Sequence, residues 1–501
     1  ASSSGEFVLC LRVTEQSTGL QIEAHLISDL KQTSMPPSFT ALQVGPHTSL
    51  SLDSIDQTKA ANWAVETVTA PARIFDPKRA RIVATVSGWQ TDAASRKVSL
   101  VLDGQVIASK TVDIPKSGRA QVEFLSFNIP YGAHRGEIRM EPHDGLPGDD
   151  SYPFAMERSD PRTALFLNDG RPREAFYYKA ALDSAEDTGL TLQTGNMQQA
   201  SHGDFSKYAF VVLGDTGTVN AEMERDLTEY VRRGGSLLLS LGPQSIRRGT
   251  EPVTQTSIHV SHETQGVGQM DSNHPALRGI GRLNQVQFFE TARFEPLAGS
   301  RTLIKLADGS PLLVEQSLGE GRILTFASTF DNVANDFPLH TSFLPFVAQT
   351  SSYLAGGEDT QSSTTVGTPV MLRRSMEQGT AVDVIGPGGR HELSLHDASS
   401  MASYELPAEG FYEVHRANGQ RVLVAAHADR RESDLTPVSA DTLALWRNTS
   451  NRTLAEANPA LVQTETRPWG LWRFILLLAL AVAFVESMVG IWYLRQERQL
   501  S

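Results

Sequence analysis

Sulfur chemistry contributes little to this chain, because only one of its 501 residues is a cysteine, Cys10. A lone cysteine excludes an internal disulfide framework and a zinc site built from several cysteines. Stability must therefore come from hydrophobic cores. The cysteine content also gives no indication of the redox compartment.

Positive charge is scarce as well. The chain has 44 Lys and Arg residues against 57 Asp and Glu residues, which gives a formal net charge of -13. Proteins that bind nucleic acids need a basic surface that neutralises phosphates, and the sequence contains no dense Lys/Arg block. We therefore expect no nucleic-acid partner.

The residue patterns of cofactor and metal sites are missing too. His259 and His262 come nearest to ligand spacing, but they lie in a strand-like or loop setting without a third partner. The segment GEGR at 319–322 lacks the helix and the Lys-Ser/Thr pair of a phosphate-binding loop, and it is typical of a hairpin turn. We expect neither a cofactor nor a metal site.

One long apolar run is present, at residues 474–494. It is long enough to cross a bilayer as a helix. Trp469 and Trp472 precede it and Trp492 lies near its end, as expected of aromatic side chains at the two water interfaces. The sequence therefore predicts a single C-terminal transmembrane helix at 470–495, with the lipid bilayer as a partner.

A carboxylate interrupts this run at Glu486, where burial in lipid is expected to cost roughly 2.5 to 3.5 kcal/mol. Protonation could offset that cost, as could a polar partner on a second helix. Ala479, Ala483 and Ser487 form a stripe of small residues that would let another helix approach. The run therefore predicts association with other membrane proteins, and a tolerated neutral Glu486 is the alternative.

The rest of the chain changes character several times, and its length allows three or four domains of roughly 100 to 200 residues. Short runs with period-two alternation predict an Ig-like β-sandwich. Strands that alternate with helices predict a parallel sheet with crossover helices. We predict an α/β segment at 1–60, the sandwich at 62–158, the parallel α/β domain at 160–357, and a small β domain with a connector at 364–446.

A possible nucleophile lies in the α/β block, where residues 234–244 read GGSLLLSLGPQ. This block resembles the class I glutamine amidotransferase-like fold, in which a sharp turn after the strand carries Gly, any residue, Cys, any residue, Gly. Ser240 matches the Cys position, and Leu238 stands where the first Gly would relieve crowding. The site is therefore predicted to be degenerate.

A hydroxyl nucleophile also needs a base, and His340 is the downstream candidate. Active amidotransferases carry His, any residue, Glu at the corresponding position, whereas this chain has His340, Thr341 and Ser342. The orienting acid is missing, and Asp336 could replace it only from another turn. We predict no catalytic residues. A membrane-tethered hydrolase or amidase that uses Ser240 and His340 is the alternative.

The segment HLISDLKQ at 25–32 resembles the late strand of a von Willebrand factor A domain, and Asp29 matches a position that helps to hold a divalent cation there. The earlier Asp-x-Ser-x-Ser loop of such domains does not occur before Asp29. Metal binding by this segment alone is therefore not expected. A cation-dependent adhesion module that needs a missing N-terminal part is a further alternative.

Taken together, these features resemble the bacterial BatA-type (aerotolerance regulator-like) membrane proteins. They are the A-domain remnant, the sandwich, the degenerate amidotransferase-like block, the ESDL segment at 432–435 and the terminal helix. The chain begins ASSSGEFVLC without an initiator Met, and we expect an N-terminally truncated fragment. The resemblance implies an inner-membrane protein with its bulk in the periplasm. It implies no known reaction.

The predicted fold class is thus a multidomain α/β plus all-β protein with one C-terminal transmembrane helix. The predicted function is that of a membrane-anchored, non-enzymatic scaffold or protein-interaction protein outside the cytoplasm.

Overall fold

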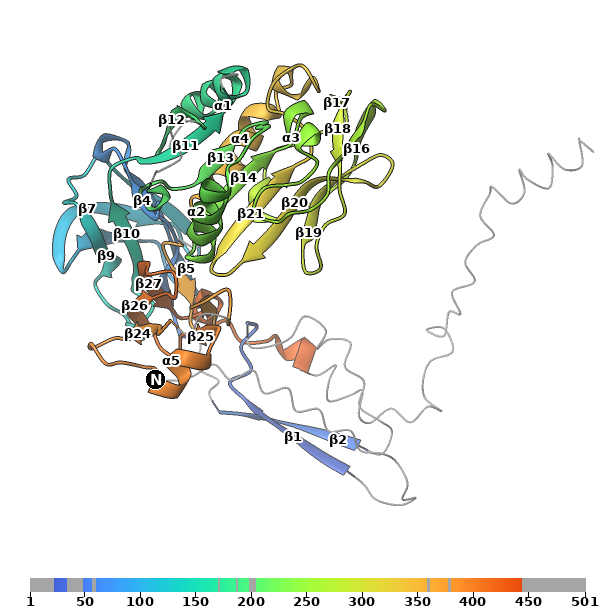
Figure 1. Ribbon diagram of the computed structural model, residues 1–501. Helices are drawn as coiled ribbons and strands as arrows, with labels where there is room; N and C mark the ends of the chain where they lie inside the picture. Colours follow the sequence, from blue (N-terminus) through green and yellow to red (C-terminus); the bar gives the residue numbers. More distant parts are fainter. Residues whose placement is uncertain are drawn as a thin grey trace, which may run out of the picture. The chain divides into compact units, whose positions relative to one another are not determined.

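The computed structural model describes residues 22–33, 48–55, 60–169, 172–185, 188–197, 204–357, 361–376 and 380–443 (Figure 1). These residues form two compact units. The first comprises the described residues between Lys59 and Thr436. The second comprises those up to Thr58 and those from Pro437 onward.

The first unit begins with a β-sandwich of two sheets, one in the order β3-β5-β8 and the other in the order β4-β10-β9-β6-β7. Alternation creates its core, since Ile82, Ala84 and Val86 of β5 are all fully buried while Arg81, Val83 and Thr85, which alternate with them, are more exposed. The strands are β3 (Asn62–Thr69), β4 (Arg73–Ile74), β5 (Arg81–Trp89), β6 (Ala94–Leu102), β7 (Gln105–Ile114), β8 (Arg119–Leu125), β9 (Gly132–Glu141) and β10 (Ser151–Arg158).

A nine-stranded sheet follows, in the order β12-β11-β13-β14-β21-β20-β19-β16-β17. The first five strands of this order, β12, β11, β13, β14 and β21, are parallel to one another. The pairs from β21 to β17 are antiparallel. The strands are β11 (Arg162–Asn168), β12 (Leu190–Asn196), β13 (Val211–Leu213), β14 (Ser236–Ser240), β16 (Gln265–Met270), β17 (Gln287–Phe288), β19 (Arg301–Leu306), β20 (Pro311–Leu318) and β21 (Gly321–Phe326). A separate pair joins β15 (His259–Ser261) to β18 (Thr291–Arg293).

Helices cover this sheet. The helix α1 (Pro172–Ser184) packs against α4 (Phe343–Leu354), and α2 (Ala221–Arg232) packs on β14 and β21 (Figure 1). The sequence explains α2 locally, because the Asn220 side chain caps its first turn and Met223, Leu227 and Val231 recur every four residues on its buried face. A six-residue helix, α3 (Pro243–Arg248), follows β14.

A small β domain completes the first unit. Its core includes the fully buried Tyr412 and Val414 of β26 and Val384 of β24. The elements are β22 (Thr364–Thr365), β23 (Pro369–Met371), β24 (Asp383–Ile385), α5 (Leu395–Ser400), β25 (Ser403–Glu405), β26 (Gly410–His415) and β27 (Arg421–His427), and a 3-10 turn follows at Arg430–Ser433.

Hydrogen bonds join the small β domain to the sandwich within the first unit. The Tyr152 hydroxyl lies 2.8 Å from Nε2 of His427, and the Ala155 amide donates to the Ser362 carbonyl at 2.5 Å. Arg430 donates to the carbonyl of Ser151 at 2.6 Å. These contacts cross from β10 to the residues that flank and form the small β domain, so the two cores are held together by specific polar contacts.

The second unit contains a parallel strand pair, β1 (Ile22–Ser28) and β2 (Thr48–Ser54), in which Ile22 lies opposite Thr48. The amide of Val438 donates to the carbonyl of Leu30 at 2.8 Å. This unit holds the segment in which the sequence predicts an A-domain remnant.

These observations correct the predicted fold class, because the described chain is mostly β. The sequence overestimated the α/β content because β16 and β19 are short and their pairing is broken by bulges, which hides the alternation of a regular strand. Across the described residues, no helix is both long and apolar enough to cross a membrane.

The predicted span at 470–495, with Glu486, lies outside the described residues. The description of this chain as a membrane protein, and its predicted location in the bacterial inner membrane, both depended on that span. Both are corrected here, because the structure contains no membrane-spanning helix among the residues it describes.

Packing at the start of β21 gives a testable result. A Cβ atom on Gly321 would lie 2.0 Å from the Val231 carbonyl oxygen and 2.2 Å from that of Gly235, and neither backbone atom can move easily. We expect Gly321→Ala to destabilise the protein by about 1 to 3 kcal/mol in urea unfolding. Gly266→Ala is the matched control in the same sheet, since its nearest neighbour would be 3.6 Å away. Equal stability of the two variants would show that this packing is wrong.

Candidate functional site

The carboxyl ends of the parallel strands β11, β13, β14 and β21 meet at one edge of the sheet, which is where open α/β sheets usually bind ligands. Asp215 follows β13, Ser240 ends β14 and Thr329 follows β21. The predicted nucleophile position therefore lies at the expected edge.

Ser240 is part of the sheet. It pairs with Phe326 in the parallel register of β14 and β21, and only 2 % of its surface is exposed. It is not among the described residues with a positive φ, so it does not occupy the strained turn of a nucleophile elbow. Its hydroxyl donates to Oε2 of Glu174 at 2.5 Å.

Glu174 lies in the first turn of α1 and is also buried. Its Oε1 accepts a hydrogen bond from the Asp215 amide at 2.9 Å, and its Oε2 accepts one from the Phe330 amide at 3.1 Å. Burial raises the pKa of Glu174 to about 7, although its hydrogen bonds oppose this shift. The sequence does not single out Glu174, because an acidic residue in a first helical turn is ordinary.

The carboxylate of Asp215 caps the N-terminus of α3. Its carboxylate accepts hydrogen bonds from the amides of Gly242 at 3.1 Å, Gln244 at 3.0 Å and Ser245 at 2.8 Å. A Cβ on Gly242 would approach Cγ2 of Thr329 to 2.4 Å and Cγ of Asp215 to 2.8 Å, so a glycine is needed here. The amides that could hold an anion at this edge are therefore occupied by the chain's own carboxylate.

His340 has a different partner from Ser240. Its Nε2 lies 3.2 Å from Oδ1 of Asp336, and the two residues flank one 3-10 turn at Phe337–Leu339. The expectation that Asp336 must come from another turn is wrong, because the turn folds it back onto the ring. Asp336 also accepts a hydrogen bond from the Gln287 amide at 2.7 Å. An acid-histidine pair exists, but neither its ring nor its carboxylate hydrogen-bonds to Ser240.

The other residues considered in the sequence are held by local contacts. His262 lies 3.4 Å from a Glu290 oxygen on the surface, and His259 is on β15 opposite Arg293. Oδ1 of Asp29 accepts the Lys31 amide at 3.3 Å. Residues 319–322 connect β20 and β21 in an antiparallel hairpin.

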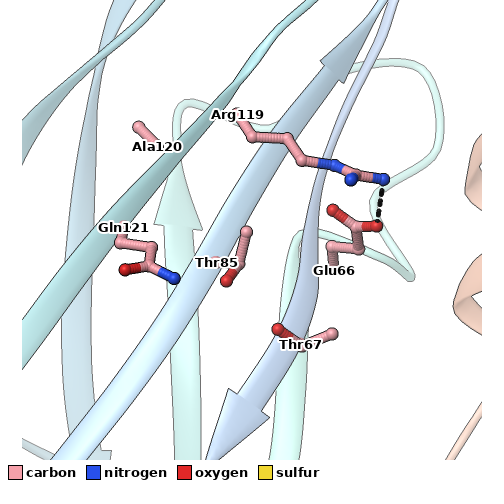
Figure 2. Close-up of a pocket in the computed structure, with 6 residues that line it drawn as sticks. All are labelled: Glu66, Thr67, Thr85, Arg119, Ala120 and Gln121. Carbon is pink, nitrogen blue, oxygen red and sulfur yellow. Dashed lines mark hydrogen bonds and ion pairs between the residues drawn. The ribbon is translucent and has the colours of Figure 1, made fainter.

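An open polar hollow of about 340 Å³ lies on the outer face of the sheet β3-β5-β8 (Figure 2). Its lining residues are Glu66, Thr67, Thr85, Arg119, Ala120 and Gln121. Nη2 of Arg119 lies 2.6 Å from Oε1 of Glu66, and the Ser87 hydroxyl donates to the other Glu66 oxygen. Because the two charges pair with each other, the hollow shows no charge preference for a ligand.

A larger cleft of about 620 Å³ lies between α4, β20 and the segment 371–374. Its wall contains Glu315, whose carboxylate lies 3.1 Å from Nε2 of His274 and accepts a hydrogen bond from the Tyr353 hydroxyl. Burial alone would raise the pKa of Glu315, but these hydrogen bonds and the charges of His274 and Arg322 hold it below its usual value. The buried negative charge is thus balanced within the chain.

Comparison with protein-family models and with curated proteins finds no match. Similar solved structures include the CARDB domain of the PF1109 protein from Pyrococcus furiosus, in complex with di-metal ions (15 % identity, 20 % of this chain and 90 % of that chain, TM-score 0.19). They also include a ThuA-like protein from Bacteroides uniformis (9 % identity, 39 % of this chain and 92 % of that chain, TM-score 0.30). A β-galactosidase from Bacillus circulans is similar as well (13 % identity, 51 % of this chain and 41 % of that chain, TM-score 0.28).

At such low TM-scores, none of these likenesses establishes a shared fold. They do not bear on the predicted resemblance to BatA-type proteins or to the amidotransferase-like fold, which stays a prediction.

The raised pKa of Glu174 predicts how stability depends on pH. A carboxyl whose pKa is higher in the folded state stabilises the fold fully below its unfolded pKa of 4.5, and this contribution is lost as the pH rises through about 7. The full effect is on the order of 3 kcal/mol. Relative to Glu174→Gln, which cannot ionise, the wild-type chain should lose stability between pH 5 and pH 8 in urea unfolding followed by circular dichroism.

The exposed Glu295 in the same domain supplies the control. Glu295→Gln should follow the wild-type pH dependence closely. A stability difference between wild type and Glu174→Gln that does not change with pH would contradict the assigned burial of Glu174.

Proposed function

We propose that this chain is a non-enzymatic scaffold that binds other proteins through the sandwich. The observation that carries the proposal is the strand β7, which ends the sheet order β4-β10-β9-β6-β7 and therefore pairs on one side only, with β6. It is visible at the outer side of the sandwich (Figure 1).

Apolar side chains at the start of β7 are exposed. Val106 is 59 % exposed and Ile107 is 39 % exposed, and Leu125 at the end of β8, an edge strand of the other sheet, is 57 % exposed. A ten-residue edge strand with apolar side chains is a usual site for the addition of a strand from another protein. Lys110 is a charged residue of the kind that discourages strand addition at an edge. Its ammonium group is engaged elsewhere, because it donates a hydrogen bond to the Glu123 carbonyl on β8. We infer that the partner supplies an extended segment.

Two further features support a scaffold over an enzyme. The Ser240 hydroxyl is buried and hydrogen-bonded to Glu174, so a substrate would have no access to it. The sandwich and the small β domain are joined by side-chain hydrogen bonds, such as that between Tyr152 and His427, which would keep a bound partner in a fixed geometry. The hydrolase alternative draws support from the pair of His340 and Asp336, but it needs Ser240 to leave the sheet.

Charge placed on the β7 edge tests the proposal. We expect Val106→Glu combined with Ile107→Lys to abolish most of the partner recovered by cross-linked affinity capture of the full chain, because the new charges disfavour strand pairing and apolar contact. Leu395→Glu is the matched control, since Leu395 is a 94 % exposed apolar residue on α5. Circular dichroism checks that each variant is folded.

Recovery should be unchanged in Leu395→Glu and in Ser240→Ala. If the β7 variant recovers the same proteins as the wild-type chain, the surface is wrong. If recovery or turnover of a ligand depends on Ser240, the hydrolase alternative replaces the scaffold.

A further inference from the structure

Three carboxylates converge in the loop between β9 and β10. They belong to Asp144, Asp149 and Asp150, and one oxygen from each lies within 4.8 Å of the other two. Three oxygens spaced evenly around a calcium ion, each about 2.4 Å from it, are about 4.2 Å apart. The three carboxylates are therefore close enough for a small adjustment of their side chains to bring them all onto one ion.

Burial of two of these carboxylates provides a second and independent observation. Asp149 is 4 % exposed and Asp150 is fully buried, and among the described residues Oδ1 of each has no hydrogen-bond partner. A buried polar atom without a partner costs roughly 1 to 3 kcal/mol, and more if it is charged. Two such oxygens in one loop are available to a ligand from outside the protein chain.

The fold fixes these side chains through their other oxygens. Oδ2 of Asp149 accepts a hydrogen bond from Nδ2 of Asn62 at 2.7 Å. Oδ2 of Asp150 lies 3.0 Å from Nδ1 of His143 and accepts the Asp144 amide at 3.3 Å. One oxygen of each buried carboxylate is thus held in place, while the second remains without a partner.

Asp144 is oriented by backbone amides. Its Oδ2 accepts a hydrogen bond from the amide of Trp63 at 2.8 Å, and its Oδ1 accepts one from the amide of Leu146 at 2.8 Å. An oxygen that already accepts one hydrogen bond keeps a second lone pair for an ion. Its half-buried position places Asp144 at the solvent side of the cluster, where an ion could enter.

The positive groups around the cluster offset only part of its negative charge, and Arg430 favours the ionised form of Asp149 without contacting its carboxylate. Arg430 donates to the backbone carbonyls of Gly148 at 3.3 Å and Ser151 at 2.6 Å, and it lies 3.7 Å from Glu409. No salt bridge links it to one of the three aspartates. The exposed ring of His143 contacts Asp150 directly, and it adds positive charge only when it is protonated.

We propose that Asp144, Asp149 and Asp150 bind a calcium ion, with water completing the coordination. A site made only of carboxylate oxygens suits a hard cation, and calcium accepts irregular oxygen geometry, whereas magnesium requires a near-ideal octahedron. The sequence predicted no metal site, because the aspartates fall in DGLPGDD, which matches no ligand motif. The loop that folds back between β9 and β10 brings them together.

Binding at this position would strengthen a joint between distant segments. Nδ2 of Asn62 donates both to Asp149 and, at 2.9 Å, to the Ser433 carbonyl. An ion that holds Asp149 also holds Asn62, and through it the turn at 430–433. Calcium should therefore raise the melting temperature of the sandwich and not only that of its loop.

Calcium titration of the full chain, stripped of metal with a chelator, tests the site. Isothermal titration calorimetry should show one ion per chain, the melting temperature should rise with added calcium, and magnesium should bind at least tenfold more weakly. The double variant Asp149→Asn with Asp150→Asn should lose at least tenfold in calcium affinity. Asp92→Asn, at a 92 % exposed position of the same sandwich, should bind like the wild-type chain.

The half-buried Asp144 gives a milder variant in case the double variant does not fold. Asp144→Asn should also weaken calcium at least tenfold. Binding of calcium with unchanged affinity in the folded Asp144→Asn variant would overturn the proposal. The absence of both binding heat and a melting shift in the wild-type chain at millimolar calcium would do the same.

Discussion

One buried carboxylate closes the carboxyl edge of the α/β sheet. Glu174, carried by the helix that follows β11, accepts hydrogen bonds from the amide after β13, the hydroxyl that ends β14 and an amide after β21. Removing a carboxylate from water is costly. The three donors offset that cost only while α1 and the ends of β13, β14 and β21 keep their positions. The edge that most α/β sheets leave open for ligands is thereby filled by the chain itself.

Because this edge is filled, we expect binding at other parts of the molecule. With Ser240 bound to Glu174 and Asp215 bound to the start of α3, the polar groups of the edge have partners within the chain. The sandwich is different. Its strand β7 pairs with one neighbour only, and its loop between β9 and β10 carries carboxylate oxygens without a hydrogen-bond partner among the described residues. Both features, and the side-chain contacts to the small β domain, favour a role in binding.

Local patterns in the sequence predicted part of this structure. The four-residue spacing of Met223, Leu227 and Val231 places α2, and alternation in β5 places a sandwich strand, because each signal reports one buried face. The antiparallel strands β16 and β19 could not be predicted in this way, because they are short and their pairing is broken by bulges. The residues of a predicted transmembrane helix lie outside the described chain.

The site was less predictable than the fold. Glu174 and Ser240 are 66 residues apart in sequence, and only the parallel order of β11, β13 and β14 brings them together. The contact between His340 and Asp336 depends on a single 3-10 turn, and the cluster of Asp144, Asp149 and Asp150 depends on how one loop folds back. Such contacts arise from tertiary geometry that residue spacing alone does not encode.

Burial and its bond to Glu174 make Ser240 a structural residue and not a nucleophile. Treatment of the native full-length chain with a fluorophosphonate, which reacts with activated serine hydroxyls, tests this when mass spectrometry then examines the peptide that contains Ser240. We expect no adduct on this peptide. A stoichiometric adduct on Ser240 would show that its hydroxyl is accessible and activated.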